Sequence, residues 1–322
     1  MDQRRPMETE QKSEAMDSKT AERKTDAGHR AGKAVPAERQ TAQQAKPVVP
    51  DHGFTHSGIF HADDVFSTAM LGMLNPNFTV TRGTAVPTDF DGIVYDIGGG
   101  RFDHHMADKR VRDNGVPYAA FGLLWEVYGT SFLSEKNAAR FDREFIQPMD
   151  QSDNTGTDHA LSDCISDFLP LWYEQSDPES FDRKFEEAVS FASVILKNRF
   201  ARLNAGDLGY AAARKKIEET KGPVLELDRS MPWKEACLEA LSILYVIYPS
   251  HRGGYNVQAV PKRAYGPENR KPFPRAWRGK SPEELQRLTG IAGFHFCHNS
   301  GFLCVGESLE DARKIAALAV KS

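Results

Sequence analysis

The sequence predicts an α/β protein with an N-terminal domain built on a mainly parallel sheet with flanking helices, and a smaller C-terminal α+β domain. Two observations support this fold class. In the first part of the 322-residue chain, short apolar runs that end in acidic or imidazole side chains alternate with helical patterns. In the last third, runs of alternating polar and apolar residues flank turn residues. We expect a disordered polar tail over 1–50, a first domain over 51–222 and a second over 223–322.

The composition is that of an ordinary globular protein, with 40% hydrophobic and 27% charged residues and a formal net charge of -4. This charge argues against a highly basic nucleic-acid binder, although a local groove of Lys and Arg could still hold a polyanion. The four cysteines lack Cys-x-x-Cys pairing, so they suggest neither a zinc site nor a disulfide framework. The sequence shows neither a membrane span nor a secretory signal, and we expect a cytoplasmic protein with no membrane partner.

Residues 1 to about 50 are rich in Lys, Arg, Glu, Gln, Thr and Ala and carry almost no large apolar side chains. Such a segment cannot bury enough apolar surface to offset the entropy lost on ordering, which is why we predict a disordered tail. A mitochondrial presequence is an alternative, but the acidic residues of this segment disfavour it.

The first candidate site residues fall where a predicted strand and loop, residues 54–64, lead into a buried helix over 65–74. His56, His61, Asp63 and Asp64 lie at this junction, which is where open α/β folds place ligands. The alternative is purely structural: an acid caps the helix, and the histidines hydrogen-bond within the loop.

The stretch from Val94 to His105 favours a functional site. The predicted strand 92–95 ends in Asp96, three glycines follow, and Asp103, His104 and His105 come directly after the turn. Another strand is predicted over 78–82. Two carboxylates about 4 Å apart repel by roughly 4 kcal/mol at an effective dielectric of about 20, and a divalent metal would relieve this repulsion.

Two helices are predicted next, over 117–129 and over 135–149. The second ends near Asp150 and Asp153, which one helical turn would place on a common face. They either cap the surface or form a further ligand station. The region 168–222 is predicted to be helical, with a buried apolar stripe.

The C-terminal third is predicted to contain a strand over 224–228, a helix opening at 232–235, and two hairpins. The first hairpin joins 243–248 to 255–260, and the second spans 290–306. Between them lies a loop, 261–280, in which aromatic residues alternate with cations. This composition suits phosphate contacts and base stacking, although a solvated surface loop is the alternative. The closing helix begins at Ser308 with Asp311 three residues on, close to a capping box.

The candidate ligands share oxygen or imidazole nitrogen donors and lie in four stations along the chain. They are His56, His61, Asp63, Asp96, Asp103, His104, His105, Asp150 and Asp153. This donor set suits manganese or magnesium, with cobalt or zinc as further options. A central aspartate can bridge two ions about 3.5–4 Å apart, an arrangement that favours phosphoester hydrolysis, and we expect Asp96 to be that bridge.

These motifs resemble those of the DHH phosphoesterase superfamily, and more narrowly those of the MYG family, named for a melanocyte proliferating gene. The resemblance is carried by four motifs, namely Thr55 to Asp63, Asp96 to Gly99, Phe102 to His105, and Asp150 to Asn154. Later segments of the chain, such as Gln258 to Lys262 and His298 to Phe302, are also similar to that family. The similarity runs from about residue 53 to 320.

The resemblance implies a two-domain, metal-dependent phosphodiester hydrolase that acts as a 3′-to-5′ exonuclease on RNA or short oligonucleotides, with 51–222 as the DHH-type catalytic domain. It implies that His56, His61 and Asp96 hold one Mn²⁺, or alternatively Mg²⁺ or Co²⁺. Asp63, Asp96, His104 and one of Asp150 or Asp153 would hold the other. His105 would meet the scissile phosphate. Expected catalytic residues are Asp96, His104 and His105, and expected phosphate contacts in the substrate-binding domain are Lys262, Arg275, Arg278 and His298.

Two alternatives stay open from the sequence. One is a hydrolase of a small phosphate compound such as pyrophosphate or a dinucleotide, and the other is a non-enzymatic, metal-binding regulatory protein. The sequence leaves the oligomeric state open.

Overall fold

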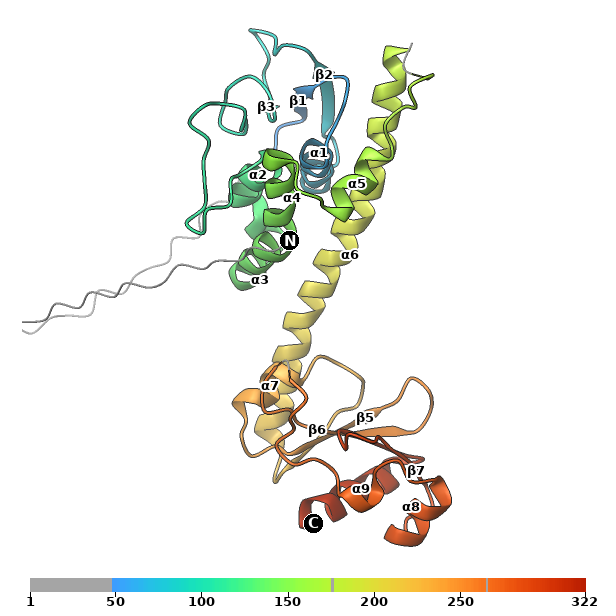
Figure 1. Ribbon diagram of the computed structural model, residues 1–322. Coiled ribbons are helices and arrows are strands. Elements are labelled where there is room, and N and C mark those ends of the chain that lie inside the picture. Colours follow the sequence, from blue (N-terminus) through green and yellow to red (C-terminus); the bar gives the residue numbers. More distant parts are fainter. Residues whose placement is uncertain (1–47, 175–176, 265) are drawn as a thin grey trace, which may run out of the picture. The chain divides into compact units, whose positions relative to one another are not determined.

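The computed structural model describes residues 48–174, 177–264 and 266–322 (Figure 1). The predicted disordered tail lies outside these residues, apart from positions 48–50. The first elements are β1 (His52–His56), α1 (Ala62–Leu74), β2 (Thr79–Gly83) and β3 (Ile93–Val94). The three strands form one sheet in the order β2-β1-β3, and β1 runs parallel to both neighbours. The predicted order of strand, helix, strand and strand is confirmed, and so is the parallel pairing.

A group of helices follows this small sheet. It comprises α2 (Ala120–Tyr128), a 3-10 turn η1 (Gly129–Ser131), α3 (Glu135–Phe141), a π-helical segment η2 (Asp142–Ile146), α4 (Gln147–Thr155), α5 (Ala160–Ser166) and α6 (Pro178–Glu219). The helical course predicted to end near residue 149 continues to Thr155. Asp150 and Asp153 therefore lie inside α4 and do not follow the helix.

The first hydrophobic core is largely aromatic. Phe66 of α1 packs against Phe121 and Phe145, with ring centroids 5.7 and 5.6 Å apart. Helix α6 adds Phe185 and Phe200 to this core through the stripe predicted from the sequence. A continuous 42-residue helix replaces the several helices expected over 168–222. Because α1 is buried along most of its length, the start of α1 is held firmly beside the strand ends.

The C-terminal elements build a second, mixed sheet. They are β4 (Val224–Glu226), α7 (Lys234–Glu239), β5 (Tyr245–Pro249), β6 (Tyr255–Ala259), a 3-10 turn η3 (Arg275–Trp277), α8 (Pro282–Thr289), β7 (Phe294–Cys297), β8 (Leu303–Gly306) and α9 (Leu309–Lys321). The strand order is β4-β5-β6-β8-β7; β4 and β5 are parallel and the other pairs antiparallel. Both predicted hairpins are confirmed. Helix α9 begins after Ser308, whose hydroxyl accepts a hydrogen bond from the Asp311 backbone N–H at 3.1 Å.

The two faces of this sheet are covered differently. Helix α9 contacts β5, β6, β7 and β8 (Figure 1). Tyr245 and Ile247 are buried in the core that contains residues of α9. Val246, between them, points into a separate core with Trp233 and Ala213 at the β4–β5 end. On this second face, the outward side chains of β6, β8 and β7 are only partly covered.

No helix within the described ranges combines the length and the apolar character that a membrane crossing requires.

Candidate metal centre

The carboxyl ends of β1 and β3 lie at the same edge of the small sheet because the two strands are parallel. His56 ends β1, and Asp96 follows β3 by two residues. The start of α1, with Asp63 and Asp64, lies at the same edge, and Asp64 Oδ2 is 3.3 Å from His56 Nε2. The sheet topology thus gathers residues that are about forty positions apart in the sequence.

Asp96 lies at the centre of the cluster. One of its carboxylate oxygens, Oδ2, is 3.1 Å from His56 Nε2, and the other, Oδ1, is 3.0 Å from His104 Nε2. The carboxylate is buried and faces a different imidazole with each oxygen. A carboxylate placed in this way can bridge two cations.

The backbone around Asp96 is held in an unusual turn. Asp96 has φ +59°, and it is the one non-glycine residue with positive φ among the described residues. Gly98 and Gly99 follow with φ +87° and +70°. The turn is closed by the Asp96 N–H, which donates to the Phe102 carbonyl at 2.9 Å, and by the Gly99 N–H, which donates to Asp103 Oδ2 at 2.6 Å. This closure presents His104 and His105 next to Asp96.

Three groups of side chains bring their donor atoms within 4.8 Å of one another, so that each could hold a metal ion. They are His56 with Asp64 and Asp96, Asp96 with His104 and His105, and His61 with Asp63 and Asp153. His104 Nε2 links the last two groups, because it lies 3.2 Å from Asp153 Oδ2 and 3.6 Å from Asp63 Oδ2.

Two buried carboxylate oxygens in the cluster have no hydrogen-bond partner. They are Oδ1 of Asp63 and Oδ2 of Asp64, and both residues are fully buried. Leaving an ionised carboxylate oxygen unsatisfied inside a protein is costly, and a divalent cation would satisfy it. Oxygen and imidazole donors are those that manganese, magnesium, cobalt and zinc accept, so the residues present fit a divalent metal.

The pKa values of the acids reflect this crowding. Burial, followed by the charges of Asp96 and Asp153, raises the pKa of Asp63 well above its ordinary value. Burial also raises the pKa of Asp64 to about 7, although the charge of His56 opposes it. For Asp96, burial is outweighed by the imidazoles of His104 and His56, which lower the pKa to about 2. The metal-free cluster therefore favours added positive charge beside Asp63 and Asp64.

The pKa values of the His56 and His104 imidazoles are also raised. Burial lowers the pKa of His56, but the hydrogen bond to Asp96 and the charges of Asp64 and Asp96 outweigh it and raise that pKa to about 9. The pKa of His104 is raised as well, since Asp96 and Asp153 outweigh its burial. Metal ions would displace these protons, because imidazole binds metal in its neutral form.

Asp150 and Asp153 have different surroundings. Asp153 belongs to the cluster, whereas Asp150 Oδ2 accepts a hydrogen bond from Arg112 Nη2 at 2.7 Å. Arg112 also donates to Asp142 Oδ1 at 2.8 Å. The pKa of Asp150 is still raised to about 7, because burial outweighs the guanidinium. Of the two predicted alternatives, the geometry favours Asp153 as a ligand.

A cavity of about 400 Å³ adjoins the cluster. His104, His105, Asp153, Asn154 and Lys109 are among the residues that line it. His105 is 59% exposed, and its Nδ1 lies 2.8 Å from Asp103 Oδ1. Lys109 Nζ donates to Asn154 Oδ1 at 3.0 Å. The cavity thus offers an imidazole and an ammonium group beside the candidate metal ligands.

The four predicted phosphate contacts lie in the C-terminal part of the chain, and their surroundings differ from one another. Lys262 is paired with Glu268 at 3.1 Å, and Arg275 is exposed on η3. Arg278 donates from Nε and Nη2 to the Phe273 carbonyl at 2.9 and 2.7 Å, which favours a structural role for it. His298 is half-buried against Phe302, with ring centroids 4.6 Å apart.

Sequence reasoning gave Asp64 only the alternative role of a helix cap and did not count it among the metal ligands, and it assigned no role to Lys109 or Arg112. Asp64 follows Asp63 directly and could have been included from the same motif. Its side chain also accepts a hydrogen bond from the His61 N–H at 2.9 Å, as a capping residue does, so the capping and site interpretations both apply. Lys109 and Arg112 lie in a loop without a recognisable pattern.

This fold and cluster define an α/β protein with a carboxylate–imidazole centre suited to divalent cations. The chain belongs to the MYG1 family, because residues 54–320 match the family model described as "Uncharacterised protein family (UPF0160)".

Relatives from distant organisms are similar over most of their length. The "MYG1 exonuclease" of Rattus norvegicus is 28% identical over 320 residues, covering 81% of this chain and 82% of the relative. The "MYG1 exonuclease" of Homo sapiens is 27% identical, with 85% and 86% covered. The "MYG1 protein" of Chlamydia trachomatis is 27% identical, with 85% and 98% covered. No solved structure matches the chain.

Proposed function

We propose that this protein is a divalent-metal-dependent phosphodiester hydrolase of the DHH type, and that it acts as a 3′-to-5′ exonuclease on RNA or short oligonucleotides. The observation that carries the proposal is the buried Asp96 carboxylate, whose two oxygens face His56 and His104. The relatives named as exonucleases support a nucleic-acid substrate. The polarity and the choice of RNA rest on the family resemblance.

Two metal sites would share Asp96. His56, Asp64 and Asp96 would hold one ion, and Asp63, Asp96, His104 and Asp153 would hold the other, with His61 beside Asp63 and Asp153 as a further ligand. When bound, divalent ions of this kind lower the pKa of water and neutralise charge that develops on a phosphate. Mn²⁺ is the proposed ion, and Mg²⁺ and Co²⁺ fit the same donors.

The residues beside the cluster have their own proposed tasks. The Asp103 carboxylate holds Nδ1 of His105, which leaves Nε2 for contact with the substrate. Lys109 adds a positive charge to the same cavity. Asp96 and His104 keep the cluster in one arrangement before the substrate enters, so little reorganisation is needed during the reaction. In the same proposal, residues 51–222 form the catalytic domain and 223–322 the substrate-binding domain.

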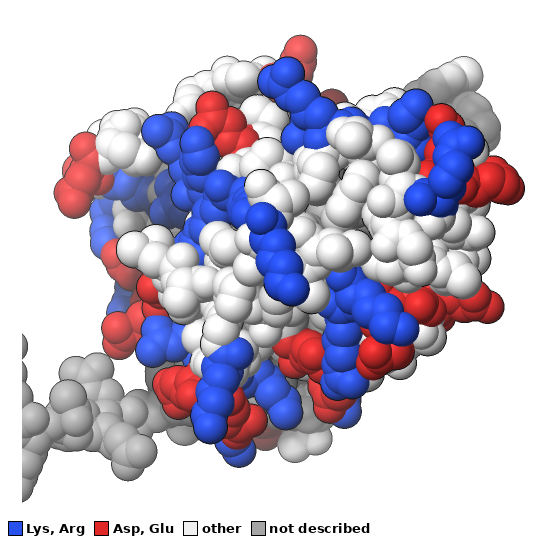
Figure 2. Space-filling model, turned by 90° about the horizontal axis from the view of Figure 1, so that it is seen from below, with Lys and Arg blue, Asp and Glu red and all other residues white. Residues whose placement is uncertain are grey.

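The surface charge is compatible with a polyanionic substrate. Figure 2 shows a face on which Lys and Arg side chains extend across a largely uncharged area. A chain with a formal net charge of -4 therefore still presents local positive areas, which attract phosphates.

The proposal is tested by incubating the purified protein with RNA labelled at the 5′ end and Mn²⁺. We expect stepwise shortening from the 3′ end, which stops with EDTA and falls at least 100-fold in Asp96→Asn. Asp113→Asn, at an exposed position, is the control and should retain activity. Equal cleavage by the Asp96 variant would contradict the proposed site. Hydrolysis of a dinucleotide or pyrophosphate but not of RNA would favour the small-phosphate alternative.

A further inference from the structure

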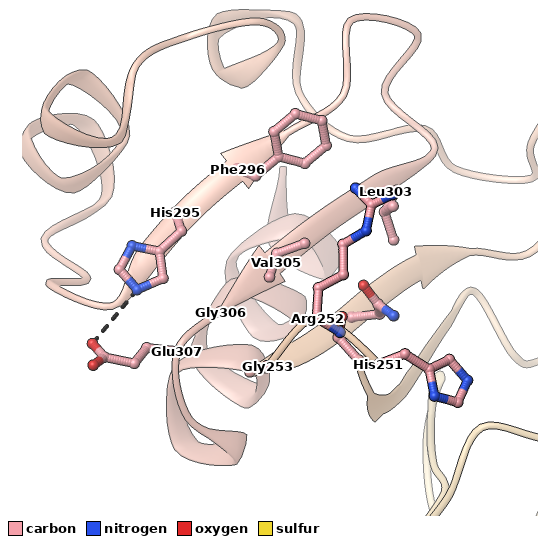
Figure 3. Close-up of a pocket in the computed structure, with 12 residues that line it drawn as sticks. His251, Arg252, Gly253, His295, Phe296, Leu303, Val305, Gly306 and Glu307 are labelled. Atoms are coloured by element: carbon pink, nitrogen blue, oxygen red, sulfur yellow. Dashed lines mark hydrogen bonds and ion pairs between the residues drawn. The ribbon is translucent and has the colours of Figure 1, made fainter.

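A second cavity, of about 680 Å³, lies on the C-terminal sheet between the β5–β6 turn and strands β6, β8 and β7. Its lining includes Arg252, Asn256, His295, Phe296 and Val305 (Figure 3). None of these residues belongs to the candidate metal centre or to the predicted phosphate contacts. The volume lies in the range typical of small-ligand sites, about 300–1,000 Å³.

A β-bulge places an aromatic ring at this cavity. In β7 the pairing register shifts between Phe294 and Phe296, so that strict alternation is broken. Phe294 is fully buried, while His295 and Phe296 both lie on the outer side and Phe296 is 43% exposed. Without the bulge, alternation would have turned Phe296 to the same face as Phe294. The strand irregularity therefore leaves one aromatic ring accessible to a ligand.

The outer face of the sheet continues from this ring across two more strands. Phe296 pairs with Val305 of β8, and Val305 pairs with Asn256 of β6. The row places an aromatic ring, an aliphatic side chain and an amide side by side on a flat support. Such a row can stack a planar base and offer hydrogen bonds to its edge.

The β5–β6 turn provides the cationic wall of the cavity. Arg252 is exposed on this turn and extends from it toward the hollow (Figure 3). Gly254, which has φ +69°, lets the turn pack closely against the end of β8. A Cβ at this position would lie only 2.5 Å from the Gly306 carbonyl oxygen. The acid in the lining, Glu307, lies 3.6 Å from His295 Nε2.

We propose that this cavity binds a segment of single-stranded nucleic acid, with a base stacked on Phe296 and a phosphate paired with Arg252. The inference rests on the proposed function for the ligand class, but the binding itself requires no metal. An aromatic ring beside a cation is the arrangement by which sequence-tolerant single-strand binders hold nucleotides. His298, predicted from the sequence as a substrate contact, lies next to Phe296 with ring centroids 6.2 Å apart.

The test is binding of a fluorescein-labelled octauridylate to the full chain in EDTA, measured by fluorescence anisotropy. Base stacking on an aromatic side chain contributes about 1–3 kcal/mol. Phe296→Ala should therefore weaken binding by about tenfold, and Phe296→Trp should retain it. Arg252→Ala should weaken binding and reduce the slope of log K against log salt by about 0.7, the value for one phosphate contact on a single strand.

Matched controls come from other elements. Phe191 of α6 is 37% exposed, close to the value for Phe296, and Arg287 is exposed on α8. Phe191→Ala and Arg287→Ala should each change affinity less than twofold. Thermal unfolding of every variant checks that the protein is folded, and the exposure of the altered side chains leads us to expect unchanged midpoints.

The outcomes separate this inference from the proposed function. Undetectable binding by the parent protein, or equal affinity of the parent and Phe296→Ala, would overturn the inference. So would equal loss of affinity in Phe191→Ala. Normal binding that depends on Phe296, together with no hydrolysis by the parent in Mn²⁺, would support the inference while contradicting the proposed function.

Discussion

At the scale of single residues, the cluster around Asp96 shows features that stability alone does not explain. Asp96 holds a left-handed backbone conformation, which costs about 1–3 kcal/mol for a residue other than glycine. Asp63 and Asp64 each bury a carboxylate oxygen that accepts no hydrogen bond. Such strain and crowding are typical of functional sites, where the arrangement serves binding at the expense of stability.

Replacing Asp64 by Asn should stabilise the metal-free protein, because the amide removes a buried charge beside Asp63 and Asp96. We expect a gain of about 1 kcal/mol, which corresponds to roughly 2–4 °C in unfolding midpoint for a chain of this size. Differential scanning calorimetry in EDTA measures it. Asp113→Asn, at an exposed position, is the control, and an Asp64→Asn midpoint at or below the parent value would contradict the argument.

At the scale of elements, the site depends on how closely helices α2 and α4 pack against each other. Gly122 of α2 leaves room for the Arg112–Asp150 pair, since a Cβ there would lie 2.0 Å from Asp150 Oδ2 and 2.6 Å from Arg112 Nη2. The pair in turn ties α4, which carries Asp153, to the loop that precedes α2.

Gly122→Ala should destabilise the protein by about 3 kcal/mol, because the added methyl group disrupts a buried ion pair. The matched control is Gly72→Ala in α1, where nothing lies within 4 Å of the added Cβ. That change should be neutral or stabilising by up to about 1 kcal/mol, since alanine favours helix. Chemical denaturation of both variants provides the comparison. Equal effects on the free energy of unfolding would show that the Arg112–Asp150 pair does not fix the packing of α2 against α4.

Arg270 is a second tie between elements. Its guanidinium donates to the carbonyls of Ala240, Ile243, Cys237 and Leu238, at and beyond the carboxyl end of α7. Arg270→Ala should lower the free energy of unfolding by about 3 kcal/mol, because several carbonyls lose a charged donor. Exposed Arg263 is the control, and its replacement by Ala should change stability by less than about 0.5 kcal/mol.

The sequence predicts the elements better than their exact extents. Periodicity and turn residues were sufficient for the parallel strands, both hairpins and the cap at Ser308. Helices α5 and α8 were missed. Helix α8 nevertheless carries a complete capping box, Ser281 with Glu284, which lies directly after the basic loop. Short helices have few periodic positions, so their apolar stripe gives little signal.

The candidate site shows a similar limit. The motifs were sufficient to predict that His56, Asp96 and His104 lie close together, since each lies at a strand end or directly after a turn. They could not separate Asp150 from Asp153, because the partner of Asp150 is Arg112, 38 positions earlier in the chain. Packing between elements decides which of Asp150 and Asp153 faces the cluster, and the spacing of the two residues within one helix does not predict it.

At the scale of the whole molecule, metal binding should be coupled to folding. A cation that binds only the folded cluster stabilises it by about 2.7 kcal/mol at a concentration 100 times its dissociation constant. We expect Mn²⁺ to raise the unfolding midpoint of the parent protein by several degrees and to leave that of Asp96→Asn nearly unchanged. Equal shifts in both proteins would indicate that the ion binds elsewhere.

The central claim is that Asp96 joins two metal sites, and the number of bound ions tests it most directly. Isothermal titration of the EDTA-stripped, dialysed protein with Mn²⁺ should give two ions per chain. Asp96→Asn should bind at most one, and Asp113→Asn should still bind two. Absence of Mn²⁺ binding by the parent protein, or two ions bound by the Asp96 variant, would contradict the account.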